Sequence, residues 1–136
     1  MPTSTNYKHK FEFVGDSLTV GYGDMSGTNI KCFFRMRHNE DCLESWATHL
    51  SKKFNAEYRL IAESGKGVVK NAPFIFGQVM PVLYSKITSN SKPGTYHHQD
   101  KYNPDVIIVF LGVNDYNNLI APGKNNFIVG YEKMIT

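Results

Sequence analysis

Three stretches of the chain have the apolar pattern of β-strands. Polar and apolar residues alternate over Lys10–Val14, which stops at Gly15, and a second short run with apolar positions covers Tyr58–Ala62. The third stretch, Asp105–Leu111, is almost entirely apolar. A run of that kind predicts a strand covered on both faces, as occurs in parallel sheets flanked by helices.

Helical spacing separates the first two strands. Between Asp41 and Phe54 apolar residues recur every three or four positions, and Asn39 or Asp41 can cap the start of this predicted helix. The stretch 21–39 is rich in Gly, Asn, Asp and Ser, which predicts a long surface loop. A short helical turn is expected directly after Ser17, and a helix N-terminus at that place would favour developing negative charge.

Helices and loops are also predicted in the C-terminal half. Phe74–Ile87 is predicted to be helical, with Pro81 in its first turns or interrupting it. Residues 88–103 are polar and predict a loop, and a last helix is expected to begin near Asn125 or Asn126. Strands and helices therefore alternate, which predicts an α/β fold with a parallel sheet and right-handed crossovers.

The length and charge of the chain limit the number of domains and the kinds of partner that we expect. With 136 residues it has room for one domain, which we expect over residues 10–136 after a frayed terminus at 1–9. The net charge of +3 comes from scattered Lys and Arg without a basic stripe, so no nucleic-acid partner is expected. No apolar run could span a bilayer and the polar start has no signal-peptide core, so no membrane partner is expected and the compartment stays open.

The cysteines and histidines do not predict a cofactor site. Cys32 and Cys42 are expected to be free thiols, although a disulfide across the short loop between them stays open. They form no CxxC pair, and no His or Cys cluster has zinc-like spacing. We therefore expect neither a metal nor an organic cofactor.

Three predicted loops carry residues suited to one reaction. Loops that follow parallel strands meet beyond the carboxyl ends of those strands, which brings Ser17, Gly65 and Asn114 to the same edge. Ser17 offers a nucleophilic hydroxyl, Gly65 an unobstructed backbone N–H, and Asn114 a side-chain N–H. Together with the N–H of Ser17, these donors suit the oxyanion of acyl transfer. Neither GxxxxGK[ST] nor GxGxxG occurs, so the loops match no phosphate or dinucleotide motif.

These loops resemble the sequence blocks of the SGNH (GDSL) hydrolases. Gly15-Asp16-Ser17-Leu18 matches the first block, Gly65 fits the glycine of the second, and Gly112-Val113-Asn114-Asp115 fits the third. Further segments look closest to carbohydrate esterase family 2, whose members remove acetyl groups from plant cell-wall polysaccharides and related sugars. These segments are Gly21-Tyr22-Gly23, Glu63-Ser64-Gly65-Lys66-Gly67-Val68-Val69 with Asn71, and Met80-Pro81-Val82-Leu83-Tyr84. The resemblance runs from about Phe11 to the end of the chain.

The resemblance implies both a fold and a site. The fold is a three-layer, flavodoxin-like parallel sheet, incomplete at its C-terminal side because the family's last strands and helix are missing. The site has Ser17 as nucleophile and an oxyanion hole formed by Ser17 N–H, Gly65 N–H and the Asn114 side chain, with no cofactor.

The resemblance also leaves the catalytic base unassigned. The family takes its base from an Asp-x-x-His block well after the Asn block, whereas every histidine of this chain precedes Asn114. These histidines are His9, His38, His49, His97 and His98. We therefore expect a fragment or truncated product, or a divergent enzyme with its base elsewhere.

Simpler roles stay open for the residues of the predicted site. Ser17 could cap a helix, Gly65 could serve turn geometry alone, and Asn114 could close an Asx turn. Asp16 is expected to pin its loop, and Asp115 is expected to have a structural role.

Aromatic residues near the predicted site are candidates for sugar contacts. Tyr22 and Tyr116 lie in or beside the site loops, as does the Phe33-Phe34 pair, and each can stack on a sugar ring. Trp46 is expected to lie in the core instead.

The sequence favours a serine esterase that hydrolyses O-acyl esters, foremost O-acetyl esters of small or polymeric carbohydrates. One alternative is a catalytically incomplete pseudo-enzyme or sugar-binding domain that keeps the oxyanion cradle, which is the set of N–H donors from Ser17, Gly65 and Asn114. Another alternative is a lipase or thioesterase of the same superfamily. A sheet without its last strands also predicts self-association through an exposed edge.

Overall fold

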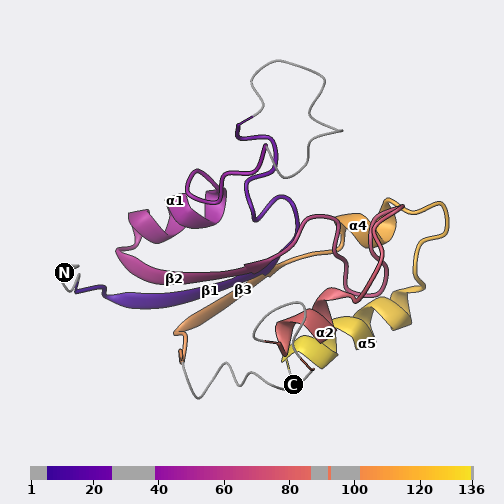
Figure 1. The fold of residues 1–136 in the computed structure, drawn as a ribbon. Coiled ribbons are helices and arrows are strands. Elements are labelled where there is room, and N and C mark those ends of the chain that lie inside the picture. The colour runs from indigo at the N-terminus through magenta and orange to yellow at the C-terminus, as the bar shows by residue number, and fades with distance from the viewer. Residues whose placement is uncertain (1–5, 26–38, 87–91, 93–101, 136) are drawn as a thin grey trace.

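The computed structural model describes residues 6–25, 39–86, 92 and 102–135, and its centre is a sheet of three parallel strands (Figure 1). The strands are β1 (His9–Gly15), β2 (Ala56–Ala62) and β3 (Val106–Phe110), in the spatial order β2-β1-β3. Gly15, the last residue of β1, lies opposite Ala62 on one side and Phe110 on the other. The three strands therefore end at the same level of the sheet.

Helices cover both faces of this sheet. The described helices are α1 (Trp46–Lys53), α2 (Met80–Tyr84), α4 (Val113–Tyr116) and α5 (Lys124–Ile135). Phe13 of β1 is fully buried, and its ring meets Trp46 of α1 edge to face at 5.3 Å. The next residue, Val14, points to the opposite face and packs against Met80 of α2 and Met134 of α5. Figure 1 shows α1 on one side of the sheet and α2 with α5 on the other, which confirms the predicted three-layer α/β fold.

The first helix begins five residues later than the predicted start at Asp41. Ser45 is its N-cap, because its hydroxyl accepts a hydrogen bond of 3.5 Å from the N–H of Thr48. The predicted cap at Asn39 or Asp41 is wrong. The Asp41 carboxylate instead accepts a hydrogen bond from the N–H of Leu43, which closes a local turn that competes with the helix.

The second predicted helix is also shorter than expected. Phe74 and Gly77 have φ angles of 66° and 93°, in the left-handed region that a right-handed helix cannot contain. Helix α2 therefore starts only at Met80, with Pro81 in its first turn as predicted. Helix α5 begins at Lys124, which agrees with the predicted start within one residue.

Strand β3 is an edge strand of the described sheet, and the prediction that both of its faces are covered holds only in part. It pairs with β1 and with no other strand of the described residues. Ile108 and Val109 pack into the two apolar layers, but Val106, Ile107 and Phe110 are 43–49% exposed. The apolar run predicted two covered faces, but it could not show how completely the helices cover them.

A buried carboxylate lies in the middle of the sheet and was not predicted. Glu12 is fully buried, and its Oε1 accepts a hydrogen bond of 2.6 Å from the hydroxyl of Tyr84. Nη1 of Arg59 lies 3.9 Å from the other carboxylate oxygen. Burial and the bond to Glu12 raise the pKa of Tyr84. The ring of Tyr102 lies 4.1 Å from the Arg59 guanidinium, and burial raises the pKa of Tyr102 to about 12.

Two smaller features of the described residues complete the fold. Cys42 is an exposed free thiol, whereas Cys32 lies outside the described residues. The helices described are too short or too polar to cross a bilayer.

Candidate active site

The side chain of Asn114 joins the loops that follow the three strands. Its Nδ2 donates a hydrogen bond of 3.1 Å to the carboxylate of Asp16, which follows β1. The same nitrogen donates a bond of 2.8 Å to the carbonyl of Lys66, which follows β2. Asn114 itself lies in α4, just beyond β3, and is 7% exposed. The predicted convergence of the three loops is thus confirmed by direct contacts.

Ser17 lies in a tight turn at the end of β1. The N–H groups of Thr19 and Val20 both donate to the carbonyl of Asp16, at 3.0 and 3.2 Å. The helical turn predicted after Ser17 is therefore present as a single turn, but no helix extends from it, and the predicted helix N-terminus is missing. Ser17 is partly exposed, and its position as a nucleophile stays a prediction.

Gly65 occupies a position where a side chain would not fit. Its φ is 80°, and a Cβ placed on it would lie 2.6 Å from Cγ1 of Ile75. Its carbonyl accepts a hydrogen bond of 2.8 Å from the N–H of Ala72, so the loop folds back over it. The structure therefore requires glycine here for close packing as well as for the turn. Its role as an oxyanion donor stays a prediction.

The amide of Asn114 is fully engaged in the structure. Its two N–H bonds can satisfy two acceptors, and the Asp16 carboxylate and the Lys66 carbonyl take both. An oxyanion bound at this place would have to share or replace one of these acceptors. The oxyanion role of Asn114 therefore stays a prediction. The Asp16 carboxylate would compete with the oxyanion for the hydrogen bond that Asn114 Nδ2 donates.

Asp115, the next residue, pins the loop after β2. It is fully buried, and its carboxylate accepts hydrogen bonds from the N–H groups of Val68, Val69 and Lys70 at 2.9, 2.6 and 2.8 Å. Three donors from one loop converge on a single carboxylate. The structural role predicted for Asp115 is confirmed, and the contacts show that it consists of holding this loop.

Asp16 is also held in place by its neighbours. Its Oδ1 accepts a hydrogen bond of 3.1 Å from the N–H of Leu18, while Oδ2 faces Asn114. Burial raises the pKa of the Asp16 carboxyl above its ordinary value, and the nearby Asp115 charge adds to this, although the bond from Leu18 opposes it. Asp16 pins its own turn, as predicted, and also links it to Asn114.

The described histidines do not pair with Ser17. His9 begins β1, at the opposite end of the strand from Ser17, and stacks on Phe11. His49 is exposed on α1, with its Nε2 at 3.2 Å from the carboxylate of Glu44. His38, His97 and His98 lie outside the described residues.

The predicted sugar-contact tyrosines lie at the site but differ in exposure. Tyr116 is 51% exposed in α4, two residues after Asn114, and its ring lies 5.1 Å from that of Phe127. Tyr22 is largely buried and forms an isolated antiparallel bridge with Glu40. Phe33 and Phe34 lie outside the described residues. Sugar binding by either tyrosine stays a prediction.

Two polar contacts beside Gly65 were not predicted from the sequence. The hydroxyl of Ser64 donates a hydrogen bond to the carboxylate of Glu40, 24 positions away. The Lys66 side chain is buried, and its Nζ donates a bond of 3.0 Å to the carbonyl of Phe76. Neither contact leaves a local signal, because both join residues that meet only in the folded chain.

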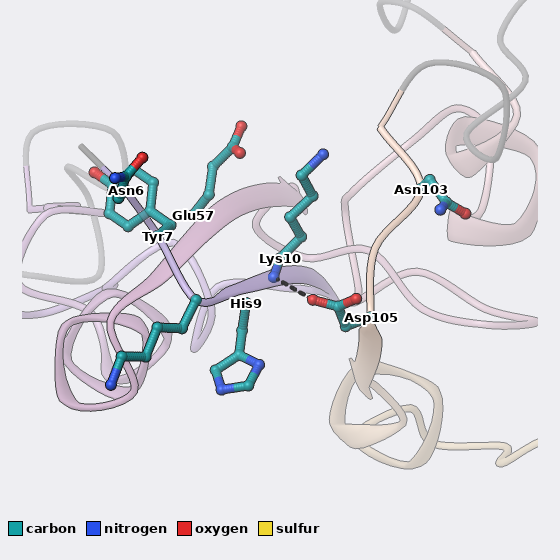
Figure 2. A pocket seen from close by; sticks show the side chains of 8 residues that line it. Asn6, Tyr7, His9, Lys10, Glu57, Asn103 and Asp105 are labelled. Atoms are coloured by element: carbon teal, nitrogen blue, oxygen red, sulfur yellow. Dashed lines mark hydrogen bonds between the residues drawn. The ribbon is translucent and has the colours of Figure 1, made fainter. Parts of the chain in front are cut away.

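A polar hollow of about 340 Å³ lies at the opposite end of the strands and is not part of this site. Figure 2 shows Lys10 and Glu57 directed to one side of the strands and His9 directed to the other side. The N–H of Lys10 donates to the Asp105 carboxylate at 2.8 Å, which ties β1 to the chain before β3. In the described ranges, no three His, Cys, Asp or Glu side chains gather in a way that could hold a metal ion.

The comparisons with known proteins agree with this architecture. The sequence model of the GDSL-like Lipase/Acylhydrolase family matches residues 13–136, which include all three site loops. The chain therefore belongs to the GDSL-like lipase/acylhydrolase family of ester hydrolases.

Within that family, the chain is similar to two curated proteins that are named as esterases. The chain is 32% identical over 129 residues to the cellulase/esterase CelE of Acetivibrio thermocellus, a match that covers 95% of this chain and 15% of CelE. It is 29% identical over 113 residues to the acetylxylan esterase / glucomannan deacetylase of Cellvibrio japonicus, which covers 83% of this chain and 31% of that protein. The chain thus spans less than a third of the length of either relative.

The chain also resembles solved structures of carbohydrate esterases. A family two carbohydrate esterase from Clostridium thermocellum, in complex with cellohexaose, superimposes with a TM-score of 0.81 at 27% identity. That match covers 99% of this chain and 40% of the other. A carbohydrate esterase family 2 enzyme with a carbohydrate binding domain, from Corynascus thermopiles, gives a TM-score of 0.78 at 27% identity over 99% of this chain and 42% of that one. Both solved structures are thus of family 2 carbohydrate esterases.

Proposed function

We propose that this chain carries the nucleophile and the oxyanion donors of a serine esterase that removes O-acetyl groups from carbohydrates. The observation that carries the proposal is the position of Asn114, whose amide reaches the loops of Asp16 and Lys66 at once. Ser17 and Gly65 are the neighbours of those two residues. The three loops that the family uses are therefore held together in this chain.

In the proposed reaction, Ser17 Oγ attacks the acetyl carbonyl and the carbonyl oxygen becomes an oxyanion. The N–H groups of Ser17, Gly65 and Asn114 would donate to that oxygen, and preorganised donors of this kind lower the barrier of acyl transfer. The bond between the carbonyl carbon and the sugar oxygen then breaks, and that oxygen takes a proton and leaves as a sugar hydroxyl, which gives an acetyl-enzyme. Water attacks the acetyl-enzyme, acetate is released and the Ser17 hydroxyl is restored.

The proton of Ser17 needs an acceptor. The family resemblance implies a histidine for this role, and neither His9 nor His49 is placed for it. We assign no base among the described residues. The proposal concerns Ser17 as the nucleophile and the N–H donors around it.

The relatives support the proposed substrate class. CelE is named a cellulase/esterase, and the Cellvibrio protein an acetylxylan esterase and glucomannan deacetylase. Acetylated xylan or glucomannan is therefore the first substrate to try. A lipase or thioesterase of the same superfamily is the alternative, and it predicts a preference for long acyl chains.

The test compares acetate release from acetylated xylan with hydrolysis of long-chain p-nitrophenyl esters. The proposal predicts turnover of the acetylated polymer, abolished by Ser17→Ala and retained by Ser64→Ala as the matched serine control. A preference for long-chain esters would support the lipase alternative. Binding of the polymer without Ser17-dependent hydrolysis would support a sugar-binding pseudo-enzyme.

A further inference from the structure

Two phenylalanine side chains stand almost fully in solvent beside the candidate active site. Phe74 is 91% exposed and Phe76 is 86% exposed. Both lie in the loop between β2 and α2, on either side of Ile75. Single exposed apolar side chains are common on protein surfaces, but neighbouring ones can mark a binding surface.

The backbone of this loop is held by hydrogen bonds. The carbonyl of Phe76 accepts a bond from the buried Lys66 ammonium group at 3.0 Å. The amide of Asn71 donates to the carbonyls of Gly77 and Gln78 at 3.2 and 3.4 Å. The N–H of Ile75 donates to the carbonyl of Ala72 at 3.0 Å. The two rings are therefore presented by a fixed loop.

Ile75 attaches this loop to the candidate oxyanion glycine. Its side chain lies directly over Gly65, where a Cβ would come within 2.6 Å of Cγ1. The inward side chain of Ile75 thus contacts the site, while Phe74 and Phe76 on either side of it are exposed. The two rings lie at the rim of the site and contribute little to the core.

The backbone at Phe74 is strained, because this bulky residue has a positive φ angle. Its φ of 66° lies in the left-handed region, which is a real outlier for a bulky residue. Glycine or asparagine would adopt this conformation at lower cost, and the exposed ring gains almost nothing from packing. Strain of this kind collects at ligand-binding positions.

We propose that Phe74 and Phe76 form an aromatic platform that stacks on pyranose rings of the polysaccharide substrate next to the acetylated sugar. This inference rests on the proposed function. A pyranose has an apolar face of C–H bonds and a rim of hydroxyl groups. Separate phenyl rings set among polar groups, such as the side chains of Asn71 and Gln78, match that pattern.

A protein partner is the competing occupant, and the adjacent loop offers a control. Leu119 is fully exposed, on a loop tied to the same region by the bond from Asn118 Nδ2 to the Asn71 carbonyl at 3.1 Å. An apolar protein surface would use Leu119 as readily as the two phenyl rings. A sugar that stacks on aromatic faces would gain much less from a leucine side chain.

The experiment compares Phe74→Ala, Phe76→Ala and Leu119→Ala with the wild-type protein on acetylated xylan and on p-nitrophenyl acetate. Each phenylalanine variant is expected to lower kcat/KM on the polymer about tenfold, mainly through KM, because one aromatic contact is lost. Hydrolysis of p-nitrophenyl acetate, which has no sugar ring to stack on the platform, should stay within about twofold of wild type. Phe74→Tyr and Phe76→Tyr should restore polymer activity, and Leu119→Ala should leave both substrates unaffected.

Calorimetric titration with unacetylated xylohexaose separates this inference from the proposed function. If the wild-type protein hydrolyses neither ester, the proposed function fails, but loss of xylohexaose binding in the two alanine variants would still support the platform. The platform is overturned if the wild-type protein does not bind xylohexaose or if the alanine variants bind it as wild type does. It is also overturned if they keep polymer activity within about twofold, lose activity on both esters together, or behave like Leu119→Ala.

Discussion

The amide of Asn114 donates a 3.1 Å hydrogen bond to the carboxylate of Asp16, 98 positions earlier in the chain. This contact joins the turn that carries Ser17 to the loop that follows β3. It also places a carboxylate where the proposed mechanism needs a free amide N–H. The two residues therefore both build the cradle and compete within it.

The first prediction concerns the amide itself. Asn114→Ala should lower kcat for acetyl ester hydrolysis by about 10²–10³-fold with little change in KM, because an oxyanion donor acts mainly in the transition state. Steady-state kinetics on p-nitrophenyl acetate measure both constants. Asn117→Ala, which removes an exposed amide at the end of the same short helix, is the matched control and should keep wild-type kcat. An equal kcat in the two variants would remove Asn114 from the oxyanion hole.

The second prediction concerns the acidity of Asp16. Because the folded pKa of Asp16 is raised, its contribution to the free energy of unfolding is present below the ordinary value of 3.8 and is lost as the pH rises through the folded pKa. Asp16→Asn lacks this titration. Urea unfolding from acid to neutral pH should therefore show the wild-type advantage over Asp16→Asn shrinking as the pH rises. An advantage that grows with pH would mean that the folded state prefers the carboxylate.

The third prediction concerns Asp115. Asp115→Asn replaces two acceptor oxygens with one and turns an amide N–H toward three backbone donors. The free energy of unfolding should fall by about 2–4 kcal/mol, since buried N–H groups lose charged acceptors. Urea unfolding measures this loss, and Asp24→Asn, which changes an exposed aspartate, should stay within about 0.5 kcal/mol of wild type. A loss for Asp115→Asn no larger than the control's would show that the carboxylate does not hold the loop.

The fourth prediction concerns the open edge of β3. The strand has one described neighbour and leaves Val106, Ile107 and Phe110 about half exposed, so a second copy of the chain can add its own β3 there. Sedimentation velocity should show concentration-dependent association that Ile107→Lys abolishes. Ile135→Lys, which places the same charge on an exposed residue of α5, should still associate. A wild-type protein that stays monomeric at high concentration contradicts the prediction.

The sequence predicted the parts of the fold that depend on local pattern. The alternation up to Val14 and the apolar run ending near Leu111 located β1 and β3, because strand periodicity is written in consecutive residues. The loop chemistry then located Ser17, Gly65 and Asn114, since loops after parallel strands share one edge.

Features that depend on distant contacts could not be predicted in this way. The exposure of Val106 and Ile107 depends on which elements pack against the two faces of β3, and the burial of Glu12 depends on Tyr84 from another element. The shortened α2 follows from the left-handed backbone at Phe74, a conformation that sequence patterns disfavour for this residue type. Each difference arises where tertiary context overrides local propensity.

The central claim is that Ser17 is a nucleophile held in an oxyanion cradle. The most direct test is covalent labelling of the protein by a fluorophosphonate probe, followed by peptide mapping. The account predicts a single adduct on the peptide that contains Ser17, absent from Ser17→Ala and retained in Ser64→Ala. Labelling no greater than in the Ser17→Ala variant, or an adduct mapped to Ser64, would contradict it.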